Sequence, residues 1–355
     1  MGGSPRRAPG LSPLSIPLHT PDQALGPTAI ALGSFDGLHC GHRRVIAAVT
    51  PPAVAAPDNE ALDRGDGSAT GRALLPGSAL VPSVVSFWPH PRELLHGETR
   101  LRLDLPEDKL DLLEPLGIRQ LVLVPFTREL AALSPRAFVE EVLAGQLRAR
   151  RVAVGENFRF GAGRCGDATD LAHIGSSCGM AVEVVPMLWD GAERMSSSRI
   201  RRALAAADLV EAERLLERPY RFQGRVVPGR GLGRGLGWPT ANLQVDGRKF
   251  LPREGVYAVL AWRTRAVGAA MPAVMNLGPQ PTVDPLAPSA VEVHLLERDI
   301  ELSGDQLIVQ PVRYLRGQER FPDLEALAAR RSEEHTSELQ SHSDLVCRLL
   351  LEKKK

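Results

Sequence analysis

The sequence has little of several features that would mark a protein's class. It contains four cysteines in 355 residues and no C-x-x-C pair, so neither a disulfide framework nor a zinc site is expected. No apolar run approaches the roughly 20 residues that span a bilayer, and no apolar segment follows the N-terminal arginines as it would in a secretory signal. The formal net charge of +1 gives no electrostatic case for nucleic acid or a membrane surface as a partner. A cytoplasmic location is therefore expected.

The residues that are present are typical of a folded globular protein, with 43% hydrophobic and 24% charged. A chain of 355 residues predicts two domains. Over residues 28–190, short apolar runs alternate with helical patterns, which predicts a parallel, doubly wound α/β sheet. Over residues 219–330, short strand-like runs and turn signals follow one another without a long helix, which predicts a small antiparallel all-β barrel.

Three further segments complete this organisation. Residues 1–27 are Pro-rich and are expected to form an irregular arm, and residues 51–77 read as a surface loop. Residues 191–218 read as a helical linker of two short helices. Within the first domain, Ser134 is predicted to cap a helix that begins at Pro135.

A phosphate-binding pattern follows the first predicted strand. The strand runs into a G-S-F-D-G turn, and the residues His-Cys-Gly-His at 39–42 then begin a helix. Backbone N–H groups at a helix start bind anions, and Gly33 and Gly37 allow the backbone to approach a ligand closely. His39 and His42 can both donate to one phosphate. The same spacing also suits a metal pair or two surface histidines, but the preceding strand and turn favour the phosphate site.

The pattern GSFDGLHCGHRRVI resembles the H-x-G-H signature of the nucleotidylyltransferase superfamily. Together with SFWPHPRELL, VPFTRELAALSPRAFVEEVL, VGENFRFGAGRCGD and MSSSRIRRAL, it resembles the prokaryotic bifunctional riboflavin kinase/FAD synthetase family, from about residue 30 to residue 327. The resemblance implies a Rossmann-like nucleotidylyltransferase domain followed by a flavokinase barrel. It also implies two activities: phosphorylation of riboflavin by ATP to FMN, then adenylylation of FMN by a second ATP to FAD and pyrophosphate.

The resemblance assigns roles to residues of the first domain. His39 and His42 would contact the ATP phosphates, and Arg201 would neutralise the transferring phosphates. Ser198 would donate a hydroxyl, and Asn157 would lie near the reacting groups. The residues of the turn that would bind ATP are Gly33, Phe35 and Gly37. Since the FMN phosphate is itself a nucleophile, adenylyl transfer needs donors and cations but no enzyme nucleophile.

A second glycine-rich segment, GRVVPGRGLGRGLGWPTANL, lies between predicted strands. Its backbone N–H groups can line a polyphosphate, although it lacks the G-K-[ST] of a Walker A motif. For the glycines alone, a flexible hairpin connection is the favoured explanation. The segment resembles the flavokinase ATP loop and its P-T-A-N motif. The resemblance implies that Thr240 and Asn242 hold Mg²⁺ and phosphate. It places ATP on the loop residues Gly229, Arg230 and Gly231.

A carboxylate on a later predicted strand completes the second pattern. In VEVHLL, strand alternation puts Glu292 and His294 on one face, opposite the valines. The resemblance implies that Glu292 is the general base that accepts the proton of the riboflavin ribityl hydroxyl. A solvent-facing carboxylate is the alternative, and the P-T-A-N motif favours the catalytic role. Mg²⁺ is the only cofactor expected, with ATP as substrate in both steps.

The chain departs from the family pattern at a few positions. Pro228 and Leu232 stand where a basic or polar residue is usual, and Gln280 stands where an arginine is usual. We expect Gln280 to weaken ligand affinity in the kinase half. The loop at 51–77 is longer than the family norm.

The last residues differ in composition from the rest of the chain. Lysine occurs only at Lys109, Lys249 and the final positions 353–355, and every other residue in the Lys-plus-Arg total of 43 is arginine. The segment 331–355 closely resembles the conceptual translation of a short-read sequencing adapter. We therefore expect a non-native tail that follows a C-terminally truncated kinase domain.

Two other functions are compatible with the resemblance. One is a member of the family with a single remaining activity. The other is a flavin- or nucleotide-binding sensor without turnover. A sensor is expected to lose His42, Arg201 or Glu292 first, and all three are present.

Overall fold

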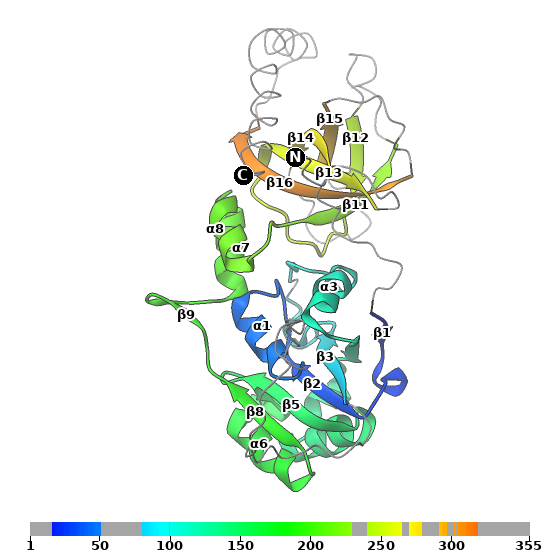
Figure 1. The fold of residues 1–355 in the computed structure, drawn as a ribbon, viewed down its shortest axis with the longest axis vertical. Coiled ribbons are helices and arrows are strands. Elements are labelled where there is room, and N and C mark those ends of the chain that lie inside the picture. Colours follow the sequence, from blue (N-terminus) through cyan, green and yellow to red (C-terminus); the bar gives the residue numbers. More distant parts are fainter. Residues whose placement is uncertain are drawn as a thin grey trace, which may run out of the picture.

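The structure is a computed structural model that describes residues 16–50, 80–98, 100–228, 240–264, 270–278, 291–296, 302 and 304–318. Two units follow one another along its longest axis, a helix-covered sheet and a barrel (Figure 1). Several residues named above lie outside the described ranges: the loop 51–77, Gly229, Arg230, Gly231, Leu232, Gln280 and the segment 331–355.

The first unit is a six-stranded parallel sheet, which confirms the predicted doubly wound domain. Its strands, in spatial order, are β1 (Leu18–His19), β4 (Gln120–Pro125), β3 (Val81–Trp88), β2 (Thr28–Leu32), β5 (Ala149–Gly155) and β8 (Ala181–Val185). The central strand β2 is buried along its whole length, as expected for a parallel strand that is covered on both faces.

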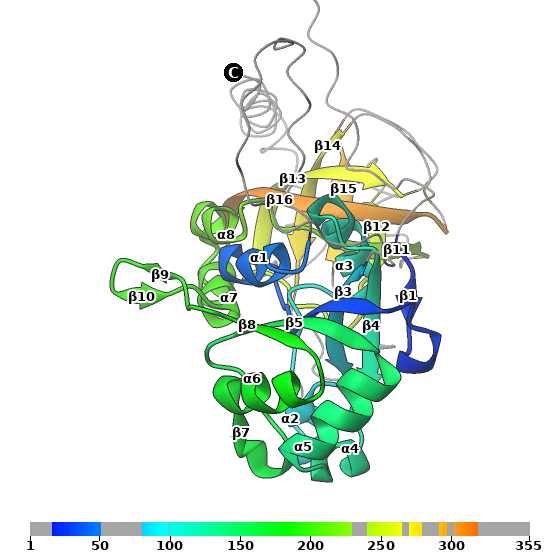
Figure 2. The same cartoon turned by 60° about the horizontal axis from the view of Figure 1, so that its bottom comes forward.

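Helices cover both faces of this sheet. On one face lie α1 (Cys40–Ala47), α3 (Pro106–Leu113) and η2 (Glu114–Leu116), and on the other lie η3 (Phe138–Gln146) and α6 (Ala168–Ser177). Successive residues of β2 divide between the two layers, because Ala31 packs with the α1 cluster and Ile30 packs with the η3 cluster. In Figure 2, α1 and α3 lie on the side of the sheet nearer the barrel, and α6 lies on the far side.

The short elements are positioned by local chemistry. Ser134 caps α5 (Pro135–Ala137) as predicted, since its side chain accepts a hydrogen bond of 3.1 Å from the Ala137 amide. The chain then continues directly into η3, so the predicted helix is present and most of it is a π-helix. The other short elements are η1 (Pro21–Gln23), α2 (Pro91–His96), α4 (Arg128–Ala132), β6 (Arg159–Phe160), η4 (Ala162–Arg164), β7 (Gly166–Asp167), β9 (Trp189–Asp190) and β10 (Glu193–Arg194).

The expected irregular arm needs one correction. Its residues Leu18 and His19 form strand β1, which pairs in parallel with Leu121 and Val122 of β4. Ile16, just before the strand, is buried in the sheet's core. A two-residue strand has no readable periodicity, so only its pairing with a distant strand reveals it.

The second unit is a closed barrel in which all neighbouring strands are antiparallel, again as predicted. Its strands, in spatial order, are β11 (Phe222–Val227), β12 (Thr240–Gln244), β15 (Val291–Leu295), β14 (Met271–Leu277), β13 (Gly255–Arg263) and β16 (Gln306–Arg316). The predicted linker helices are α7 (Ser197–Ala205) and α8 (Leu209–Leu216). They share one apolar core with the barrel, in which Leu204 and Leu215 cluster with Phe222 and Tyr257.

The two units meet along the segment 101–104 of the first domain. The Arg102 amide donates to the Arg248 carbonyl at 2.6 Å, and the Phe250 amide donates to the Arg102 carbonyl at 2.7 Å. The guanidinium groups of Arg102 and Arg248 also lie 5.3 and 5.0 Å from the Trp88 ring centre. The barrel is thus bonded to a short stretch of the first domain. None of the described helices has both the length and the apolar character of a membrane span.

Candidate functional site

The turn between β2 and α1 has an unusual backbone. Phe35, Gly37 and Leu38 all have positive φ values, of 45°, 88° and 43°. Gly37 is needed there for two reasons: its φ favours glycine, and a Cβ would lie 2.8 Å from the Leu103 side chain. The turn is therefore held in a strained shape by its packing against the neighbouring segment.

A cavity of about 430 Å³ opens at the carboxyl edge of the sheet. It is formed by the residues that follow β2, β3, β5 and β8, together with the start of α7. This edge is where open α/β sheets bind ligands. Six of the residues predicted from sequence line it: Gly33, Phe35, His39, His42, Asn157 and Ser198.

His39 and His42 line this cavity at the start of α1. Their rings stack with centroids 3.7 Å apart and an interplanar angle of 19°. Burial lowers the pKa of His39 to about 4, with Arg194 adding to this effect and Asp36 opposing it. Burial, and then the neighbouring His39 and Lys109, hold the pKa of His42 well below its usual value. Both imidazoles are therefore neutral at pH 7, and their Nδ1 atoms have no partner within the described residues.

Arg201 is placed differently from the other predicted residues. It is not among the cavity-lining residues; its guanidinium pairs with the Asp36 carboxylate and donates to the Leu101 carbonyl at 3.1 Å. Gly37 also lies outside the lining, and its carbonyl accepts from Arg218 at 3.1 Å. The contact of Arg201 with phosphate stays a prediction. It requires the Arg201 guanidinium to leave the Asp36 carboxylate and bind the phosphate instead.

Sequence reasoning missed the arginines that line the cavity. Five arginines reach the cavity: Arg92, Arg100, Arg159, Arg164 and Arg194. They come from four separate segments, and arginine is the usual basic residue throughout this chain, so composition did not distinguish them. Arg159 and Arg164 stand within the family-like segment VGENFRFGAGRCGD, and this position was the signal that could have found them. Guanidinium groups around one cavity are suited to polyphosphate.

The barrel brings together a second set of predicted residues. Asn242 on β12 is paired with Glu292 on β15, and Glu292 is paired in turn with Asn276 on β14. Val291 and Val293 are fully buried, so the predicted alternation is confirmed and Glu292 lies on the opposite face. The sequence reasoning missed Asn276, because strand register cannot be read from one segment alone.

The row Asn242–Glu292–Asn276 offers only oxygen acceptors and amide donors. Oxygen ligands suit Mg²⁺, which usually keeps waters and substrate phosphates in its coordination sphere. Thr240 begins β12 opposite His294, two residues along the strand from Asn242. Within the described ranges, no three His, Cys, Asp or Glu side chains form a metal-ligating group. The donor set therefore fits a magnesium ion shared with a nucleotide better than a site built from protein ligands alone.

Comparison with known proteins agrees with this two-part arrangement. Residues 76–199 match the family model for FAD synthetase, and residues 216–339 match the one for riboflavin kinase. The kinase match extends beyond residue 330 into the segment expected to be non-native.

Curated relatives match over most of their length. A bifunctional riboflavin kinase/FMN adenylyltransferase of Pseudomonas fluorescens is 37% identical over 298 residues, covering 83% of this chain and 87% of the relative. The protein of the same name from Escherichia coli K12 is 34% identical over 302 residues, covering 84% and 88%.

A solved structure described as a macrolide-efflux protein from Streptococcus pneumoniae has a TM-score of 0.70 and covers 91% of this chain and 98% of its own. At 23% identity this likeness shows the shared fold alone. The relatives and the two matched domains together show that the chain belongs to the bifunctional riboflavin kinase/FMN adenylyltransferase family.

Proposed function

We propose that the chain makes FAD from riboflavin in two ATP-dependent steps, one in each domain. The observation that carries this proposal is that each matched domain assembles its own set of reactive groups. The parallel-sheet domain holds the stacked histidines in an arginine-lined cavity, and the barrel pairs Asn242 with Glu292 on adjacent strands. ATP as the donor of both steps fits the cytoplasmic location expected from the sequence.

In the barrel, Glu292 accepts the proton of the ribityl hydroxyl as that oxygen attacks the γ-phosphorus of ATP, and ADP leaves. Thr240 and Asn242 are the residues that would hold Mg²⁺. The ion supplies charge neutralisation between the phosphates and the incoming hydroxyl. Glu292 is half-buried and lies next to Asn242 in strand register, which keeps the base close to the ion's ligands.

In the cavity of the sheet domain, a phosphate oxygen of FMN attacks the α-phosphorus of ATP, and pyrophosphate leaves. His39 and His42 are neutral, so each donates one N–H to a phosphate oxygen without adding charge. The arginines of the lining neutralise the negative charge of the two substrates. Asn157 and Ser198 add neutral donors at the same edge.

The test is the product spectrum of the full chain. Purified protein is incubated with riboflavin, ATP and Mg²⁺, and the flavins are separated chromatographically. FMN is expected first and FAD second, and added FMN is expected to yield FAD without riboflavin. Formation of only one product would show a single-activity member of the family. Formation of neither, by folded protein, would overturn the proposal.

A further inference from the structure

Both lysines in the described part of the chain are buried where the two domains meet. Lys109 on α3 is 7% exposed and Lys249 is 1% exposed, whereas nearly all other basic positions of the sequence are arginine. An ammonium group is compact and can direct its donors to several acceptors, which a planar guanidinium cannot do in the same space. These positions therefore call for lysine on structural grounds.

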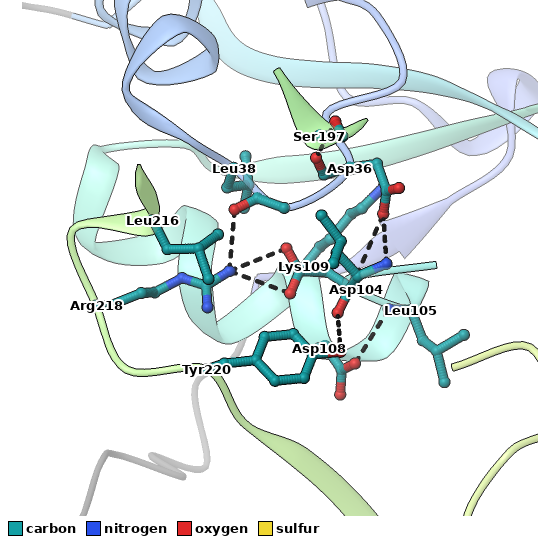
Figure 3. A network of polar contacts seen from close by, with 12 residues as sticks. Asp36, Leu38, Asp104, Leu105, Asp108, Lys109, Ser197, Leu216, Arg218 and Tyr220 are labelled. Carbon is teal, nitrogen blue, oxygen red and sulfur yellow. Dashed lines mark hydrogen bonds and ion pairs between the residues drawn. The ribbon is translucent and has the colours of Figure 1, made fainter. Parts of the chain in front are cut away.

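Lys109 connects α3 to the turn that shapes the nucleotide cavity. Its Nζ donates to the Ser34 carbonyl at 2.9 Å, and Ser34 lines the cavity directly after Gly33. In Figure 3, Lys109 lies among the carboxylates of Asp36, Asp104 and Asp108. Lys109 itself does not line the cavity, so its hydrogen bond holds the strained turn without occupying the lining.

The charges around Lys109 are divided among distinct partners. Arg201 pairs with Asp36, Arg218 pairs with Asp104 at 3.0 Å, and Lys249 pairs with Asp108 at 2.7 Å. Burial lowers the pKa of Lys109, and so does Arg102, while the three carboxylates oppose this. Burial outweighs the three carboxylates, so the pKa of Lys109 lies below the usual value for lysine.

The turn that Lys109 contacts requires support. Phe35 and Leu38 are not glycines, yet both have left-handed φ values, and such residues persist only when their surroundings hold them. Asp36 between them is held by the Leu103 amide at 2.9 Å. The Ser34 carbonyl accepts a hydrogen bond of 2.9 Å from Lys109 and a longer one of 3.4 Å from the Ser86 hydroxyl. The bonds from Leu103 and Lys109 tie both sides of Phe35 to the segment that begins α3.

We propose that Lys109 is a positioning residue of the adenylyltransferase half, which holds the Ser34 carbonyl so that the turn presents His39 and His42 to the nucleotide. This inference rests on the proposed function. Lys109 acts through the turn and through its charge near His42, and does not touch the substrates. Its like charge contributes to the low pKa of His42, together with burial and the stacked His39.

The experiment compares Lys109→Met with Lys249→Met in the full chain. Both variants remove one buried ammonium from the same network, but Lys249 donates to the Leu103 carbonyl and to Asp108, whereas Lys109 donates to the Ser34 carbonyl of the cavity turn. We expect Lys109→Met to lower kcat/KM for FMN adenylylation by about tenfold to a hundredfold, mainly through kcat, because small misplacements of reacting groups are costly. Lys249→Met is expected to change it by less than about threefold, and riboflavin phosphorylation serves as the internal reference.

A second readout does not depend on activity. The His42 ring is titrated by NMR in histidine-labelled protein, and loss of the neighbouring cation is expected to raise its pKa in Lys109→Met but not in Lys249→Met. If Lys109→Met does not fold, Lys109→Gln still tests the electrostatic part, because it removes the charge and keeps a donor.

The outcomes separate this inference from the proposed function. If the unmodified chain makes FAD and folded Lys109→Met retains its kcat/KM, or if both variants lose it equally, Lys109 has no positioning role. An unchanged His42 pKa in Lys109→Met would overturn the inference that the charge of Lys109 acts on His42. If the unmodified chain makes no FAD, the proposed function fails, while the titration still reports on Lys109.

Discussion

Asp104 and Arg218 form a buried ion pair that links the first domain to the start of the barrel. One guanidinium nitrogen of Arg218 donates to both oxygens of Asp104, at 3.1 and 3.0 Å, and to the Gly37 carbonyl at 3.1 Å. The two side chains are 2% and 16% exposed, respectively. The substitution Asp104→Asn keeps the shape of the carboxylate and removes its charge, so it isolates the electrostatic part of this contact.

The expected loss of stability follows from this burial. Breaking a buried pair by removing one partner costs about 3 to 5 kcal/mol of the free energy of unfolding, because the other charge stays buried without compensation. We expect about 3 kcal/mol here, since Arg218 keeps the Gly37 carbonyl and Asn still offers one acceptor oxygen. For a domain of roughly 150 to 250 residues, such as the sheet domain, this loss of free energy corresponds to a fall in Tm of roughly 6–12 °C.

The effect should depend on pH in a defined direction. Burial alone would raise the pKa of Asp104, but Arg218, Lys249 and Lys109 outweigh burial and hold it below its ordinary value. A lowered carboxyl pKa stabilises the fold above the unfolded value of about 4, and this contribution is lost as pH falls through the folded pKa. The difference in the free energy of unfolding between wild type and Asp104→Asn is therefore expected to have its full size at pH 7 and to decrease below pH of about 4.

Denaturant unfolding and calorimetry at pH 7 measure this difference. Glu140→Gln is the matched control, because it breaks the pair Arg136–Glu140, whose side chains are 61% and 47% exposed. Its expected cost is about 0.5 kcal/mol or less. The double variant Asp104→Leu/Arg218→Met should recover part of the loss, since no buried charge then remains unpaired. A cost for Asp104→Asn no larger than that of Glu140→Gln would refute the reasoning.

Three further predictions concern the two activities. His42→Ala should abolish FAD formation and leave riboflavin phosphorylation intact, because His42 lines the cavity of the sheet domain and not the barrel row of Asn242, Glu292 and Asn276. Glu292→Gln should stop FMN formation while added FMN is still converted to FAD; loss of both activities in either folded variant would contradict separate sites. Excess chelator should stop both steps, and Mg²⁺ should restore them, since bringing an anionic acceptor to a polyphosphate needs cation neutralisation. Full activity in chelator, measured by the same flavin chromatography, would contradict this.

Local sequence signals predicted those parts of the structure that depend on near neighbours. Ser134 and Pro135 begin a helix because capping involves only the first turn. Glu292 faces away from Val291 and Val293 because strand alternation has a period of two. The position of His39 and His42 at a helix start after a buried strand could be predicted, because the strand and the glycine turn are both recognisable within a few residues.

Contacts between distant residues decided those parts of the structure that the sequence pattern did not predict. Strand β1 exists because Leu18 meets Leu121 across more than a hundred residues, and two residues carry no pattern of their own. Asn276 joins Glu292 only through the register of β14 and β15. The π-helical form of η3 likewise gave no signal in its hydrophobic pattern.

The sequence by itself determined the parallel sheet and the antiparallel barrel that follows it, and it predicted the histidine and glutamate sites, since periodicity, turn residues and motif spacing are local. Only the tertiary structure decided which charges meet. It pairs Arg201 with Asp36, brings five arginines from four segments to one cavity and brings Lys109 into hydrogen-bond contact with the Ser34 carbonyl. The physical reason is that ion pairing depends on distance in space and on burial, and neither quantity is encoded by the spacing of residues along the chain.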